Sequence, residues 1–129
     1  MKTRILLAAV SLVGFAGAAV AATDTISASD QKIANKTVTA SDVVAVKSGY
    51  LVAHESDATG TKAGKIIGSV AVKAGDNKGV VVPLADDVKP GSKLILMLHE
   101  ESNADSKFDD KDKPVMVNGK PVMQVISVQ

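Results

Sequence analysis

The sequence has no cysteine and no tryptophan, and its 129 residues include one tyrosine and two phenylalanines. The absence of cysteine excludes disulfides, thiolate metal sites and a cysteine nucleophile. The scarcity of aromatic rings argues against the stacking platforms with which proteins hold sugars or single-stranded nucleic acid. The core of any fold must therefore be built from aliphatic side chains and methionine.

Arginine is almost absent too. The single arginine is Arg4, so the chain after the first 22 residues has no guanidinium to clamp a phosphate or a carboxylate. That part of the chain carries 13 lysines and 14 acidic residues. Such a balance provides no electrostatic attraction for nucleic acid or for an anionic membrane, and we expect neither as a partner.

Residues 1–22 have the three parts of a secretory signal. "MKTR" carries two positive charges, "ILLAAVSLVGFAGAAV" is apolar, and "AVAA" places small residues before Thr23. A retained membrane anchor is the alternative, but the 18 uncharged residues from Ile5 to Ala22 are at the lower limit of a span. We therefore predict a cleaved signal peptide over 1–22 and a single domain over 23–129. The expected location is periplasmic or secreted, without membrane insertion after cleavage.

Short apolar runs recur in this domain between Gly, Pro, Asp and Asn, and no stretch has a capped helical stripe. The expected strands cover residues 25–30, 36–46, 49–56, 65–72, 78–84 and 93–100, and two more runs flank Asn118-Gly119, a common hairpin signature. Seven or eight short strands predict an all-β fold, an Ig-like, Greek-key antiparallel sandwich, with a small closed barrel as the alternative. The runs at 43–46, 80–82 and 94–98 are continuously apolar, which favours strands covered on both faces or strands at a sheet corner.

His54 and His99 are the only histidines, and each ends an apolar run and precedes a glutamate. Side chains alternate along a strand, so His99 shares a face with Met97. If the two strands are neighbours or face one another, we expect both imidazoles near one end of the sandwich. Together with the Met97 thioether they could bind copper or zinc. The alternative is that each histidine is half-buried and hydrogen-bonds a loop backbone.

The segment "ESNADSKFDDKD", residues 101–112, is rich in oxygen ligands at alternating positions, which is typical of calcium loops. Asn103, Asp105 and Asp109 are the candidate ligands. The central glycine and the final glutamate of the helix-loop-helix calcium pattern are missing, so a solvated connector is the alternative. We expect Phe108 to anchor this loop from beneath.

The methionines form the third group of candidate metal ligands. Met116 and Met123 flank the Asn-Gly turn, and counting residue pairs outward from the turn places both on one face of the hairpin. Together with Met97 they make three thioethers that could serve copper. Packing in the core is the more usual role of such residues.

An enzyme is not expected. The chain lacks the Gly-x-Ser-x-Gly elbow, and neither His-Glu pair is followed by the second histidine of the helical zinc signature.

Six segments of the chain carry a resemblance to a known family: "SASDQ", "KTVTASDV", "GYLVAHES", "GKIIGSVAVKAGDNKGVVVPL", "KLILMLHEESNADSKFD" and "DKPVMVNGKPV". In their order and sequence they resemble a family of exported archaeal and bacterial domains, domain of unknown function 7282. The resemblance extends over nearly all of residues 23–129. It implies export and a compact β fold, and it implies no activity.

These observations lead to one expected function and one alternative. We expect a non-enzymatic, exported β-sandwich module of the cell envelope or the extracellular space, without a cofactor, which acts by contact with a protein partner in the envelope or by structural support. The alternative is a small metal-binding protein that uses His54 and His99 for copper or zinc, or the acidic loop for weakly bound calcium.

Overall fold

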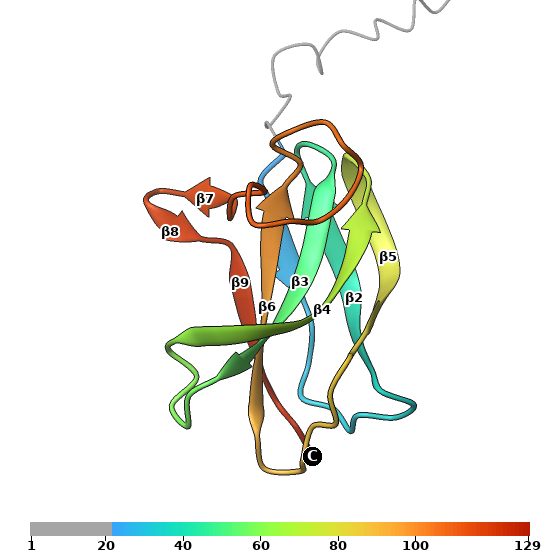
Figure 1. Cartoon of the computed structure of the whole chain (residues 1–129), viewed down its shortest axis with the longest axis vertical. Coiled ribbons are helices and arrows are strands. Elements are labelled where there is room, and N and C mark those ends of the chain that lie inside the picture. Colours follow the sequence, from blue (N-terminus) through green and yellow to red (C-terminus); the bar gives the residue numbers. More distant parts are fainter. Residues whose placement is uncertain (1–21) are drawn as a thin grey trace, which may run out of the picture.

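The computed structural model describes residues 22–129, which form two facing β-sheets and a small hairpin (Figure 1). The predicted signal peptide lies outside the described residues, apart from Ala22. The strands are β1 (Thr25–Ser27), β2 (Thr37–Ala45), β3 (Gly49–Ser56), β4 (Ala63–Val72), β5 (Gly75–Pro83), β6 (Lys93–Glu100), β7 (Met116–Val117), β8 (Lys120–Pro121) and β9 (Met123–Ser127). Residues 22–129 contain no helix long and apolar enough to cross a membrane.

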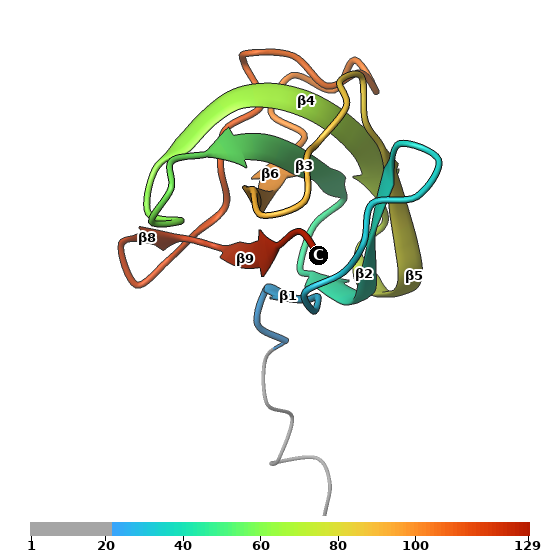
Figure 2. The same ribbon diagram turned by 90° about the horizontal axis from the view of Figure 1, so that it is seen from below.

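One sheet has the strand order β1-β2-β5 and the other the order β4-β3-β6-β9, and all paired strands in them are antiparallel. The chain changes sheet between β2 and β3, between β4 and β5, and between β5 and β6. The long strand β4 curves so that its end lies beside β5 (Figure 2). The predicted all-β antiparallel sandwich is therefore confirmed, and the barrel alternative is wrong.

The expected strand positions are close to the observed ones, except that β5 begins three residues early. Gly75, Asp76 and Asn77 were expected in a turn because of their residue types. The Asn77 side chain instead accepts a hydrogen bond from the Lys73 amide and donates to the Lys73 carbonyl, at 3.0 and 2.9 Å. These bonds shorten the connection between β4 and β5, so the strand can start at Gly75 with its φ of +105°.

The main core lies between the sheets and is aliphatic, as the composition requires. Its largest fully buried side chains on the facing surfaces are Val38, Val43, Val82, Leu51, Leu94, Leu96, Leu98 and Ile126. Burial of such side chains contributes roughly 1.5–3 kcal/mol each to folding, before the entropy cost of ordering them. This layer makes the domain stable without a disulfide.

The prediction that three apolar runs are covered on both faces is confirmed for 94–98 and wrong for 43–46 and 80–82. Val81 lies in β5 of the three-stranded sheet, and Val46 directly follows β2 of the same sheet. The outer face of this sheet is open to solvent, so Val46 and Val81 are 49% and 46% exposed. In β6, residues 94–99 are all buried. The outer face of the four-stranded sheet must therefore be covered.

Two loops cover that outer face. Residues 101–113 pass across the ends of β3 and β6 (Figure 1). At the other side, the tip of the β3–β4 connection packs on β9, since a Cβ added to Gly60 would lie 2.8 Å from Val125 Cγ1. A second buried layer is thus formed outside the main core, and both histidines belong to it.

Candidate metal centre

The second buried layer is made by alternate residues of β3 and β6. Tyr50, Val52, His54, Ile95, Met97 and His99 are all less than 8% exposed, yet none belongs to the core between the sheets. Their sequence neighbours Leu51, Ala53, Leu96 and Leu98 do belong to that core. The alternation expected from the sequence therefore holds, and it directs both imidazoles to the outer side of the four-stranded sheet.

The expectation that the two histidines lie at one end of the sandwich is wrong. Because β3 and β6 are antiparallel, His54 pairs with Ile95 and His99 pairs with Tyr50, four residues away along the strand. The two rings nevertheless meet: their centroids are 5.8 Å apart, with 22° between the ring planes. Each side chain must lean toward the other over the pair that lies between them.

Both imidazoles are held by the same kind of hydrogen bond. Nδ1 of His54 is 3.0 Å from the Gly64 carbonyl oxygen, and Nδ1 of His99 is 2.8 Å from the Asp112 carbonyl oxygen. A carbonyl oxygen only accepts, so each Nδ1 carries the proton and donates it. In a neutral ring this leaves Nε2 with a free lone pair. His99 thus holds a loop backbone, as predicted, whereas His54 bonds to a residue of strand β4, and both rings are buried where half-buried ones were expected.

The Nε2 atoms of His54 and His99 are buried and have no hydrogen-bond partner among the described residues. Buried polar atoms in folded proteins are nearly always satisfied, so two such atoms on adjacent rings need a cause. Histidines that bind metals typically donate their second ring N–H to a backbone carbonyl or a carboxylate. Each ring of the pair has that arrangement, with Nδ1 bound to a backbone carbonyl and Nε2 available to a ligand.

Burial also favours the neutral form of His99. Desolvation holds the pKa of His99 below its ordinary value of 6.5, and the nearby His54 acts in the same direction. The hydrogen bond to the Asp112 carbonyl opposes this shift without cancelling it. A neutral ring at pH 7 is the form that binds a metal ion.

The loop 101–113 is fastened over the pair by three contacts. Phe108 lies with its ring centroid 5.2 Å from His99 and 5.5 Å from Tyr50, so it anchors the loop as predicted. The Tyr50 hydroxyl donates a hydrogen bond to Glu101, which raises the pKa of Tyr50 above its ordinary value. The buried Asp112 carboxylate accepts the backbone amides of Ser102 and Asp109, at 2.9 and 2.8 Å.

The three residues predicted as calcium ligands do come together. The Asn103 amide donates to carboxylate oxygens of Asp105 and Asp109, at 3.0 Å each, and this contact holds the pKa of Asp109 below its usual range. Ala104 and Ser106 have φ values of +56° and +59°, so the backbone of this loop turns tightly through the left-handed region.

A tighter carboxylate group in the same loop was not assigned from the sequence. Oxygen atoms of Glu101, Asp105 and Asp112 lie within 4.8 Å of one another, and Glu101 Oε1 is buried without a hydrogen-bond partner within residues 22–129. Glu101 and Asp112, the two residues not assigned from the sequence, are the two ends of the acidic segment. They are far apart along the chain, so the sequence did not indicate that the loop closes and brings them together.

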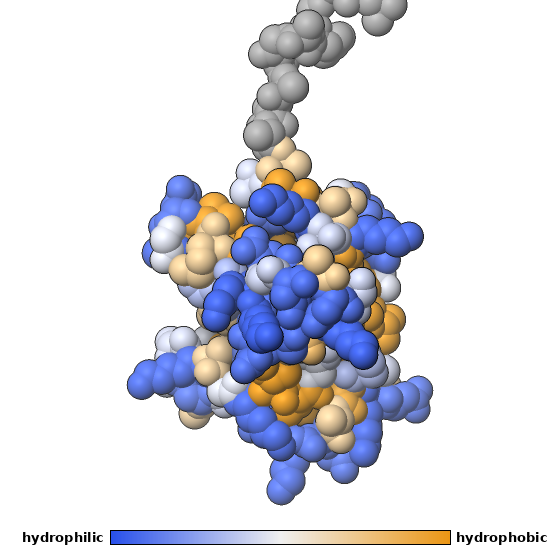
Figure 3. All heavy atoms as spheres, turned by 45° about the horizontal axis from the view of Figure 1, so that its top comes forward, coloured by the Kyte–Doolittle hydropathy of each residue, from blue (hydrophilic) through white to orange (hydrophobic). Residues whose placement is uncertain are grey.

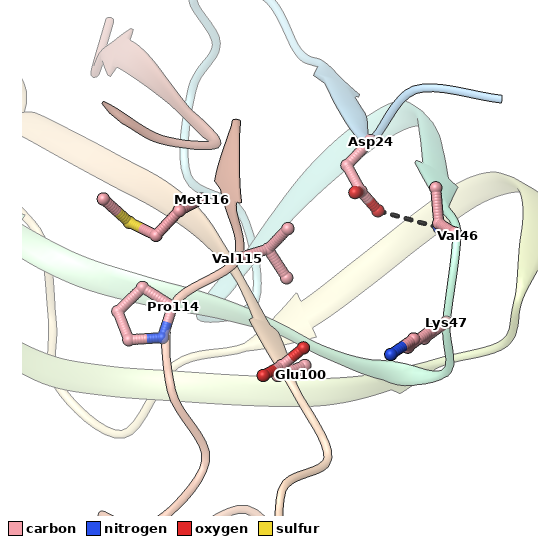
Figure 4. A pocket seen from close by; sticks show the side chains of 7 residues that line it. All are labelled: Asp24, Val46, Lys47, Glu100, Pro114, Val115 and Met116. Atoms are coloured by element: carbon pink, nitrogen blue, oxygen red, sulfur yellow. Dashed lines mark hydrogen bonds between the residues drawn. The ribbon is translucent and has the colours of Figure 1, made fainter. Parts of the chain in front are cut away.

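The three methionines are in different surroundings. Met97 is buried on β6, at a register position between the two histidines, and Met123 is half-buried on β9. Met116 is 54% exposed on β7 and lines a shallow surface pocket of about 350 Å³ (Figure 4). The surface at this end of the molecule is largely hydrophilic, with smaller apolar patches between polar side chains (Figure 3). Unlike Met97, Met116 is therefore not part of the buried histidine layer.

Comparison with known proteins identifies the family and nothing more specific. Residues 24–129 match the family described as Domain of unknown function (DUF7282). No curated protein and no solved structure matches the chain. Because the match covers the whole described domain apart from its first two residues, the chain belongs to the DUF7282 family.

Proposed function

We propose that this domain is a non-enzymatic module that binds one soft or borderline transition-metal ion, copper or zinc, between Nε2 of His54 and Nε2 of His99. The observation that carries the proposal is the pair of buried, unpartnered Nε2 atoms on rings whose Nδ1 atoms are already anchored to the backbone. A polar atom left unpaired in the interior costs free energy, and a bound ion would satisfy both atoms at once.

The spacing of the rings supports the proposal. A metal ion about 2.0–2.1 Å from Nε2 lies about 3.2 Å from the ring centroid, so two ligating rings must have centroids within about 6.4 Å of one another. The observed separation of 5.8 Å satisfies this limit. It corresponds to an open angle at the metal, which leaves room for further ligands.

Export and a protein partner are part of the same proposal. The charged start, apolar stretch and small residues of positions 1–22 support secretion to the periplasm or beyond. A buried ion must be delivered and removed. A protein partner in the envelope that supplies or receives the ion fits these features.

Titration of the mature domain with Cu(I), Cu(II) and Zn(II) tests the proposal. We expect one ion per chain with a Kd below about 10 μM, which corresponds to roughly −7 kcal/mol. The variant that combines His54→Asn with His99→Asn is expected to bind at least about 100-fold more weakly, a loss of roughly 2.7 kcal/mol. Asparagine can still donate an N–H near the Nδ1 position, but it has no atom at Nε2.

The choice of asparagine separates metal binding from folding. Circular dichroism and thermal unfolding of the double variant should show the same β fold, because both backbone anchors keep a donor. Absence of binding tighter than 10 μM by the parent domain, or equal binding by the folded double variant, would contradict the proposal.

A second candidate function is the binding of calcium by the loop 101–112. It is favoured by the convergence of three carboxylates, Glu101, Asp105 and Asp112, and by the buried Glu101 Oε1 atom that has no partner. Like charges within 4.8 Å repel one another, and a divalent ion among them would replace repulsion with attraction. Oxygen ligands of this kind suit calcium and not copper.

Thermal unfolding with and without 5 mM calcium tests this candidate. An extracellular-type site with a Kd of about 1 mM would stabilise the domain by roughly 1 kcal/mol, which is a rise in Tm of a few degrees. Asp105→Ala should abolish the rise, whereas Asp110→Ala, an exposed change in the same loop, should keep it. An unchanged Tm in the parent domain rules the calcium site out.

A further inference from the structure

We infer that the ion held by the histidine pair is copper in its +1 state, and that the thioethers of Met97 and Met123 complete its coordination. This inference rests on the proposed metal site and adds the identity of the ion and a ligand from a third strand. It follows from the methionine side chains near the two rings and from the absence, in the described residues, of a carboxylate or thiolate that clusters with both rings.

Harder ligands are missing beside the rings. In the part of the chain that the structure describes, the single cluster of three imidazole or carboxylate groups is Glu101, Asp105 and Asp112, which includes neither histidine. The chain has no cysteine. Among the described residues, no carboxylate or third imidazole therefore clusters with both rings, and methionine sulfur is the soft donor that the neighbouring strands offer.

The strand register places two methionines at the right level. Val52 of β3 pairs with Met97 of β6, and Met97 pairs in turn with Met123 of β9. This row crosses the sheet between the two histidines. His54 lies two residues after Val52 on β3, and His99 lies two residues after Met97 on β6. By register, Met97 therefore lies between the levels of the two histidines, and Met123 is its neighbour on β9.

Directly opposite residues in a sheet have Cβ atoms about 4.5–5.5 Å apart and point to the same face. Met97 and Met123 therefore extend from the same face as the histidines. Methionine has three rotatable bonds and adapts its sulfur position readily. Met123 is half-buried and lies on an edge strand, so it is also the member of the set that an arriving ion would meet first.

Two imidazoles and two thioethers form a neutral and soft set of ligands. Soft thioether sulfur selects Cu(I), whereas zinc sites are built from thiolate, imidazole and carboxylate. Charge leads to the same conclusion. With no anion to balance it, a buried monovalent ion costs less free energy to desolvate than a divalent one.

Affinities measured anaerobically, with a chromogenic Cu(I) chelator as competitor and with Zn(II) in parallel, test the inference. Met97→Leu and Met123→Leu, which nearly conserve volume, are each expected to weaken Cu(I) binding at least about tenfold and to change Zn(II) binding by less than about threefold. Met116→Leu is the matched control, because Met116 is exposed on a separate hairpin, and it should change neither affinity. X-ray absorption of the Cu(I) form should show sulfur among the ligands of the copper.

The outcomes separate this inference from the proposed function. If Cu(I) binding depends on both histidines but is unchanged by both methionine variants, or if Zn(II) binds more tightly than Cu(I), the inference is overturned and the proposed metal site stands. If the parent domain binds none of these ions, the proposed site itself fails and the inference fails with it.

Discussion

Replacing Asp112 with alanine is expected to lower the free energy of unfolding by about 2–3 kcal/mol. The Asp112 carboxylate is 2% exposed and accepts two backbone amides, those of Ser102 and Asp109, at 2.9 and 2.8 Å. Without it, both amides must find water, and the loop 101–113 loses the contact that closes it. Equilibrium unfolding in urea measures the change.

Asp110→Ala is the matched control for this prediction, because it removes the same charge from an exposed position of the same loop. It should change the free energy of unfolding by less than about 0.5 kcal/mol. Equal effects of the two substitutions would show that Asp112 acts through its charge alone and that the loop is not fastened by its hydrogen bonds.

The same substitution should move the pKa of His99. Burial under the loop holds that pKa below 6.5, so the stability contributed by neutral His99 is fully present above about pH 6.5 and is lost as the pH falls through the folded-state pKa. In Asp112→Ala two effects oppose one another: opening of the loop removes the burial that lowers the pKa of His99, and loss of the carboxylate removes a charge that raises it. Burial is the larger cause, so the pKa should rise toward 6.5, which NMR titration of the imidazole protons can follow. A pKa that falls further below 6.5 would contradict the view that the loop keeps water from the ring.

Replacing Leu96 with alanine should lower the free energy of unfolding by about 2–5 kcal/mol. Leu96 is fully buried on the inner face of β6, where it pairs with Ala53 and Gln124 and fills the core between the sheets. The alanine would leave a cavity that the surrounding aliphatic side chains cannot fully close. Val81→Ala, at a position that is 46% exposed on an edge strand, should cost about 0.5 kcal/mol or less.

A loss below about 1 kcal/mol in Leu96→Ala would contradict the assignment of the main core to the space between the sheets. The Leu96→Ala variant also serves as a control for metal binding. Because Leu96 faces the opposite side of β6 from Met97 and His99, its replacement should weaken the fold without changing the ligands of the proposed metal site. Metal affinity measured in conditions where the variant is fully folded should stay close to that of the parent domain.

Much of the fold could be predicted from the sequence, because the signals are local. Alternation in β3 separates Leu51 and Ala53 from Tyr50 and His54 without reference to any other strand. The same alternation assigned His99 and Met97 to one face of β6. The absence of cysteine and the scarcity of aromatic residues restricted the core to aliphatic side chains, as observed.

The sequence by itself thus determined the strands, the sheet faces, the aliphatic core and the soft character of the candidate ligands. Only the tertiary structure decided that His54 and His99 meet, that Met123 stands beside Met97, and that Glu101 and Asp112 close one loop. These contacts depend on strand register and on loop closure over the outer face, which join residues that are distant along the chain. Local periodicity contains no information about either.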